Sequence, residues 1–366
     1  MMKRKIILGI CNAETASACI MINGEVIFAA SEERFSRIKL DNSFPTNAIQ
    51  ECLSFCNIDI SDINIIAYSL AKRFNEDQVL NYVNLGSRYS DDKVASEIVK
   101  QRVIWEISRD KKKRLEFDIW AEENINSKYQ KIYDFYHHEA HAASASLLSP
   151  FNKGYIFTSD GRGDFESATI YKFDRYGKNQ LQKIYSATSS ESFGYFFGRI
   201  TGLLGFKPMR HEGKITGLAA FGNPNKALDL CKRMIEIKEG KVIAHLGDFF
   251  SPFFSPYSEF IKEKVKNYRR EDIAAAAQAH LENMMKELIS YYLRKNNEEQ
   301  INLMCAGGVF GNVKVTQKLK ELKEVKNCYV QPHMGDGGLC LGACALANEK
   351  DKRRVNNQTR NTKELK

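Results

Sequence analysis

The sequence predicts an α/β protein of two lobes, each beginning with a meander of antiparallel strands. Three apolar segments open the chain, and Asn23-Gly24 between the second and third fits a two-residue hairpin turn. Further strand-like segments begin after residue 152, which indicates that one architecture is used twice without a detectable sequence repeat. Late in the chain, glycine-rich turns join strands to helices, where backbone N–H groups can approach a phosphate.

The spacing of apolar residues and the positions of turn residues predict the strands and helices along the chain. The expected strands are 5–12, 16–22, 25–31, 63–70, 131–136, 155–159, 165–173, 182–187 and 301–305. The expected helices are one from about Thr46, one carrying the histidines after Tyr136, and segments 192–204, 272–294 and 338–348. We predict a first lobe at 1–151 with a largely helical insertion at 76–128, a second lobe at 152–349, and a basic, disordered tail at 350–366.

Composition excludes several classes of protein. No run of eighteen apolar residues occurs, so no membrane span is expected, and the apolar run after Lys5 is too short for a signal peptide. The nine cysteines form no CxxC knuckle, which favours reduced thiols in a cytoplasm. The net charge of +9 arises from the tail, at +5, and from segment 109–114, at +4, and we interpret the latter as a solvated helix face. A nucleic-acid partner is therefore not expected.

His137 and His141 are the first candidates for a functional site. On a helix, residues four apart project from one face, so the two imidazoles can bind one metal ion. Such a pair also occurs by chance on surfaces and in cores. Asp160 favours the metal interpretation because it ends the apolar run 155–159 and precedes Gly161, so its carboxylate lies at a strand end.

Three other segments indicate ligand contacts. Segment 32–39 carries cations that could grip an anionic or carbonyl-bearing ligand, although a solvated charged turn explains it as well. Segment 210–222, which includes Lys214, fits either a phosphate-facing corner or a salt-bridged turn. The turns 306–312 and 334–338 suggest a bound nucleotide, but neither matches a Walker motif or a dinucleotide fingerprint.

Taken together, the chain resembles the O-carbamoyltransferases of the nodulation-protein and tobramycin-carbamoyltransferase type. The matching pieces are Ala16-Ser17-Ala18, Glu32 to Lys39, Phe44-Pro45, the HHxxHAASA run at 137–145, Asp160-Gly161, Gly213-Lys214 to Gly222, Ala306-Gly307-Gly308 with Asn312, and Gly335-Asp336-Gly337-Gly338. The resemblance covers nearly the whole chain. It implies a two-lobed actin-like (ASKHA) ATPase fold, similar also to the tRNA threonylcarbamoyltransferase domain and to part of the hydrogenase-maturation carbamoyltransferase.

The resemblance also implies a chemistry. A divalent metal ion, iron(II) above all, would lie between the lobes on His137, His141, Asp160 and Asp336. The substrate would be carbamoyl-adenylate, formed from ATP and carbamoyl phosphate, and a hydroxyl of a small-molecule acceptor such as a sugar or secondary metabolite would attack it. Residues implied in binding the adenylate are Gly307, Gly308, Asn312, Gly335, Gly337 and Lys214. Lys39 and Arg37 would neutralise charge developing during the transfer.

The sequence departs from the family pattern at two places. Relatives usually carry a histidine, a candidate base, where this chain has Glu14, and a carboxylate in a dry cleft could serve instead. Relatives also continue into a domain that makes carbamoyl-adenylate, so a separate adenylate-forming protein is an expected partner. A homodimer is a further expected possibility. A non-catalytic nucleotide- and metal-binding subunit is the alternative function, and threonylcarbamoyl transfer to tRNA is a third.

Overall fold

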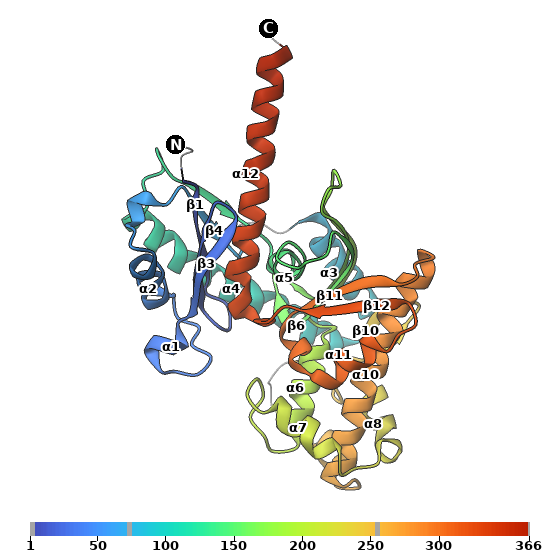
Figure 1. Ribbon diagram of the computed structural model, residues 1–366. Helices are drawn as coiled ribbons and strands as arrows, with labels where there is room; N and C mark the ends of the chain where they lie inside the picture. Colours follow the sequence, from blue (N-terminus) through green and yellow to red (C-terminus); the bar gives the residue numbers. More distant parts are fainter. Residues whose placement is uncertain (1–3, 72–74, 253–256, 365–366) are drawn as a thin grey trace. The chain divides into compact units, whose positions relative to one another are not determined.

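A computed structural model describes residues 4–71, 75–252 and 257–364, with side chains through Arg354 (Figure 1). The chain forms two compact units. Unit 1 comprises Met1–Arg73, Ser108–Pro150 and Gln331–Lys366, and unit 2 comprises Phe74–Ile107 and Phe151–Val330. Among the described residues, no helix is long and apolar enough to cross a membrane.

Unit 1 is built on a five-stranded sheet in the order β3-β2-β1-β4-β5. Its strands are β1 (Ile6–Cys11), β2 (Ser17–Ile22), β3 (Glu25–Ser31), β4 (Ile65–Tyr68) and β5 (Lys131–Asp134). The first three strands form the predicted antiparallel meander, and β4 and β5 continue the sheet in parallel from β1. Its helical elements are α1 (Glu33–Ser36), α2 (Thr46–Cys56), η1 (Ile60–Asp62), α5 (His137–Ser146), η4 (Asp336–Gly338) and α12 (Leu339–Glu364).

Both faces of this sheet are covered. Alternate residues of β1, such as Leu8, join a core with α2 and with Phe117 of α4 (Lys93–Asn124), while Ile7 and its alternates pack against α5 and α12. Figure 1 shows α12 lying along the strands of this unit. Contact with α5 is close because Gly342 of α12 has no side chain: a Cβ there would lie 1.8 Å from the carbonyl oxygen of Ala140.

Unit 2 repeats the arrangement in the order β12-β11-β6-β7-β8. Its sheet strands are β6 (Lys153–Gly163), β7 (Glu166–Asp174), β8 (Leu181–Thr188), β11 (Ile301–Ala306) and β12 (Val325–Val330), and β9 (Ile235–Lys238) and β10 (Lys241–Ala244) form a separate hairpin. Its helical elements are α3 (Glu76–Arg88), α6 (Phe193–Leu203), α7 (Glu212–Ala219), η2 (Pro224–Lys226), α8 (Leu228–Lys232), α9 (Glu259–Val265), α10 (Arg270–Lys295), η3 (Gly308–Gly311) and α11 (Val313–Lys320). In both units the first strand pairs antiparallel with the second and in parallel with the fourth, so the predicted duplication of architecture is confirmed.

The units differ from the predicted lobe boundaries in two places. Segment 331–366, predicted to lie in the second lobe and the tail, belongs to unit 1, because α12 packs against β1 and α5. The predicted insertion is divided, since α3 and the first half of α4 belong to unit 2 and the remainder of α4 to unit 1. The structure also continues α12 to Glu364, where the sequence predicted a disordered tail; no glycine or proline interrupts the chain after Gly342.

Candidate active site

The histidine helix α5 places His137 and His141 on one buried face, as predicted. His137 is 4% exposed and His141 is fully buried, and the centroids of their rings lie 4.8 Å apart. The helix is rich in alanine after His141, which allows α12 to approach closely and brings the turn that precedes α12 toward the two imidazoles.

Asp336 occupies that turn and completes a compact group within unit 1. Its Oδ1 lies 3.6 Å from Nε2 of His137 and 3.6 Å from Nε2 of His141. Its other oxygen, Oδ2, accepts the backbone N–H of Glu14 at 2.9 Å. One carboxylate oxygen is therefore fixed by the backbone, while the other is directed at both imidazoles.

The spacing of these donor atoms suits a metal ion. Two ligands about 2.1 Å from one ion at tetrahedral angles lie about 3.4 Å apart, close to the 3.6 Å between Asp336 and each histidine. Two imidazole nitrogens and a carboxylate oxygen are ligands shared by zinc and non-haem iron sites. Burial alone would raise the pKa of Asp336, but the two histidines and the N–H of Glu14 hold that pKa well below its usual range. The donor set fits a divalent cation.

His138 lies outside this group. It is fully buried on α5, and its ring centroid is 5.4 Å from that of His137 and 5.9 Å from that of His141. Its position about one hundred degrees round the helix explains why it shares no face with the other two histidines.

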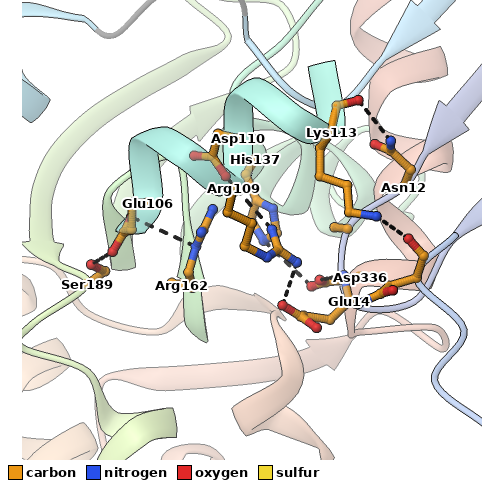
Figure 2. A network of polar contacts seen from close by, with 12 residues as sticks. Asn12, Glu14, Glu106, Arg109, Asp110, Lys113, His137, Arg162, Ser189 and Asp336 are labelled. Carbon is orange, nitrogen blue, oxygen red and sulfur yellow. Dashed lines mark hydrogen bonds and ion pairs between the residues drawn. The ribbon is translucent and has the colours of Figure 1, made fainter. Parts of the chain in front are cut away.

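Glu14 lies beside Asp336, but its carboxylate is committed to another partner. Arg109 of α4 donates to Glu14 Oε1, as Figure 2 shows. The Glu14 side chain is 33% exposed, and its role as a base stays a prediction. The interpretation of segment 109–114 as a solvated face is wrong for most of its residues, because only Lys111 and Lys112 are exposed. The Arg109 side chain is 17% exposed, and Lys113, 7% exposed, donates to the carbonyl of Asn42.

Arg37 and Lys39 lie in an exposed segment after α1, with Arg37 in a left-handed conformation at φ 59°. The nearby Glu32 has a structural role that the sequence did not reveal. It is 2% exposed, and its carboxylate accepts the backbone N–H groups of Asn47 and Ala48 at the start of α2. Glu32 therefore anchors one end of the segment that carries the two cations.

Asp160 belongs to unit 2, on β6. Its Oδ1 accepts the N–H of Gly161 at 2.6 Å, and its Oδ2 accepts the N–H of Gly308 at 3.1 Å. The carboxylate is thus held by backbone groups, as a preorganised ligand would be. Its membership of the ligand set with the histidines stays a prediction.

The turn at Gly307 and Gly308 follows β11, as predicted, and its glycines are needed for packing. Gly307 has φ 105°, and a Cβ there would lie 2.1 Å from the carbonyl oxygen of Ser159. A Cβ on Gly308 would lie 3.2 Å from Oδ1 of Asp160. The two glycines that suggested a phosphate-binding turn are therefore also required for close contact between this turn and β6.

Asn312 caps α11 and joins a polar cluster in unit 2. Its Oδ1 accepts the N–H groups of Lys314 and Val315, and its amide exchanges hydrogen bonds with the amide of Gln278.

Lys214 is exposed on α7, with Nζ 5.7 Å from the ring centroid of Phe206.

The sequence analysis did not identify Gln278 as a partner of Asn312. The available signal was that Gln278 is a polar residue in the buried alanine run of α10.

Gly335 and Gly337 precede α12 in unit 1, not in the lobe that carries the other glycine turn. The predicted adenylate-binding residues are consequently divided between the two units.

Comparison with known proteins agrees with this arrangement. A family model described as Carbamoyltransferase N-terminus matches residues 6–345. An uncharacterized protein of Methanocaldococcus jannaschii is 31% identical over 356 residues, which cover 96% of this chain and 59% of that protein. The nodulation protein NolNO of Sinorhizobium fredii is 26% identical over 336 residues, which cover 91% of this chain and 46% of NolNO. The chain spans about half the length of the curated relatives that it matches.

Among solved structures, HypF of T. kodakarensis is similar in fold, with a TM-score of 0.57 at 14% identity. The match covers 96% of this chain and 48% of HypF. Together with the duplicated sheets, it confirms the predicted two-lobed actin-like (ASKHA) fold.

Proposed function

The chain belongs to the carbamoyltransferase N-terminal family, and on that premise we propose that it transfers a carbamoyl group from carbamoyl-adenylate to a hydroxyl of a small-molecule acceptor, in a reaction that requires a divalent metal. The observation that supports this most directly is the convergence of His137, His141 and Asp336 in unit 1. A buried group of metal-ligand type within a carbamoyltransferase domain is expected for metal-assisted acyl transfer.

In this proposal His137, His141 and Asp336 hold the ion, with Asp160 as a fourth ligand and iron(II) as the metal. When bound, the ion supplies Lewis-acid polarisation of the carbamoyl and acyl-phosphate oxygens. The protein's own contribution is to fix the ligands: Glu14 orients Asp336 through its N–H, and Gly308 orients Asp160 through its N–H.

The proposed transfer step exchanges one bond at the carbamoyl carbon for another. The acceptor oxygen forms a bond to the carbamoyl carbon, the bond from that carbon to the phosphate oxygen breaks, and AMP leaves. The hydroxyl proton passes to Glu14, whose side chain lies beside the Asp336 turn. Lys39 and Arg37 would stabilise the charge that develops on the departing phosphate. The adenylate would contact Gly307, Gly308, Asn312 and Lys214, with Gly335 and Gly337 of the other turn.

The test supplies the activated substrate from outside the chain. The full chain is mixed with an enzyme that makes carbamoyl-adenylate from ATP and carbamoyl phosphate, and a panel of sugar and secondary-metabolite hydroxyls is screened for carbamate by mass spectrometry. We expect a carbamate product that requires divalent metal and is lost in His141→Ala. His245→Ala is the matched control, because that imidazole is exposed in unit 2 and pairs with Glu236.

Glu14→Gln tests the proton acceptor separately. The N–H that holds Asp336 belongs to the backbone, so this variant should keep its metal and lose turnover. Full turnover in Glu14→Gln would remove Glu14 from the mechanism without removing the metal site.

A second candidate function is a non-catalytic subunit that binds nucleotide and metal. The pairing of Glu14 with Arg109 favours it, because a carboxylate held by a guanidinium is less available to an acceptor hydroxyl. Metal and nucleotide binding without carbamate formation across the panel would support this function. Threonylcarbamoyl transfer to tRNA is the third candidate, and its test is the same assay with threonylcarbamoyl-adenylate and tRNA.

A further inference from the structure

His333 lies against the turn that carries Asp336. The side chain is exposed to solvent on one side, while the ring edge with Nε2 and Cε1 packs on Gly337. A Cβ at position 337 would lie 2.2 Å from Nε2 and 2.3 Å from Cε1. Gly337 therefore has to be glycine for the ring to lie where it does.

The backbone of His333 packs against the same turn. A Cβ on Gly338 would lie 2.1 Å from the His333 carbonyl oxygen, and the N–H of Gly338 donates to the carbonyl of Gly335 at 2.9 Å. The chain from His333 to Gly338 thus folds back tightly on itself, with Asp336 between the two contacts.

The imidazole also connects this turn to the central sheet. Nε2 of His333 lies 3.1 Å from Oγ of Ser31, and a hydrogen bond joins them. Ser31 is the last residue of β3 and is 7% exposed, so it offers a rigid partner. Glu32, which follows it, is fixed in turn to the start of α2.

We propose that His333 is a positioning residue for the metal ligand Asp336, holding the Asp336–Gly338 turn against the end of β3 through Ser31. The inference rests on the metal site of the proposed function. Two contacts then determine where the Asp336 carboxylate points: the Glu14 N–H on its Oδ2, and the His333 ring behind the turn. Ligand orientation by groups outside the ligand shell commonly contributes 10- to 100-fold in metal affinity, and we expect about tenfold here because His333 acts through the backbone.

The test measures metal affinity of the full chain, by titrating iron(II) under anaerobic conditions and zinc in parallel. His333→Ala and Ser31→Ala should each weaken binding about tenfold, and the double variant should be no weaker than either single one, since both remove the same link. His333→Gln should restore most of the affinity, because a glutamine amide can reach Ser31 from the position of Nε2. His245→Ala is the control and should bind as the parent protein does.

Hydrogen exchange of the metal-free protein gives an independent readout. The amide of Gly338 should exchange faster in His333→Ala and Ser31→Ala than in the parent, while amides of the β1–β2 pairing stay unchanged. Ser31→Ala keeps the imidazole, so it remains informative if His333→Ala folds poorly.

Parent-like affinity and exchange in both single variants would overturn the role of His333. Failure of the parent protein to bind either metal would instead refute the metal site, and the two results are distinguishable in one titration.

Discussion

The backbone N–H of Glu14 donates to Oδ2 of Asp336 across 2.9 Å, although the two residues are 322 positions apart in the sequence. The turn between β1 and β2 and the turn before α12 are therefore joined at the candidate metal group. This contact holds the Asp336 carboxylate close to His137 and His141, which lie about two hundred residues earlier in the chain.

Replacing the carboxylate should remove the metal. Asp336→Asn eliminates the anionic oxygen that lies 3.6 Å from both imidazoles, and we expect metal content measured by elemental analysis to fall at least tenfold. Asp351→Asn is the matched control, because Asp351 is equally buried on α12 but pairs with Lys5 and Lys131. Equal metal content in Asp336→Asn and the parent would contradict the assignment.

The contact of α12 with α5 should tolerate no side chain at Gly342. Gly342→Ala places a Cβ 1.8 Å from the Ala140 carbonyl oxygen, and we expect the free energy of unfolding to fall by about 1–3 kcal/mol. Gly86→Ala, in the interior of α3 with nothing within 4 Å of its Cβ, should instead stabilise by about 0.5–1 kcal/mol. Urea denaturation compares the two variants, and destabilisation by both would show that the contact at Gly342 is not the cause.

The buried ion pair of α4 should be costly to break. Glu106 is fully buried and accepts from Arg102. It also accepts from Ser189, and its Oε2 lies 3.8 Å from Nε of Arg162 (Figure 2). Glu106→Gln leaves guanidinium charge uncompensated in unit 2, at a cost of about 3–5 kcal/mol in denaturation experiments. Glu97→Gln on the same helix, where the pair with Lys100 is exposed, should change stability by less than about 0.5 kcal/mol. Similar costs for both variants would argue against the buried network.

Stability should decrease on mild acidification, partly through His280. Burial lowers the pKa of His280 below its ordinary value of 6.5, outweighing the hydrogen bond between its Nε2 and the Ile235 carbonyl. Below pH 6.5 the unfolded chain binds the proton before the folded chain does, so the contribution of His280 is complete above that pH and is lost as the pH falls toward the lowered folded value. Melting temperatures of His280→Gln should decline less between pH 7 and 5 than those of the parent, and identical declines would refute this role.

Many features could be predicted from the sequence because their signals are local. Asn23-Gly24 marks the first hairpin, the i,i+4 spacing places His137 and His141 on one helix face, and glycines mark the turns after β11 and before α12. The order of these motifs sufficed to indicate the family. For Gln278, which bonds to Asn312, the only signal in the sequence was its polar side chain within an alanine run.

Other features could not be predicted because they depend on partners distant in the chain. The basic run of α4 looked solvated by composition, yet helix packing buries Lys113 and pairs Arg109 with Glu14. Charge alone does not tell whether a cation meets water or a carboxylate, and that difference decides whether Glu14 is free.

The sequence by itself thus determined the duplicated α/β architecture and the types of ligand present, since periodicity and residue chemistry are properties of short segments. Only the tertiary structure decided that Asp336 and its glycine turn belong to the same unit as the two histidines. The physical reason is that α12 buries its apolar face on the first sheet, and this packing carries the turn back across more than three hundred residues to Glu14.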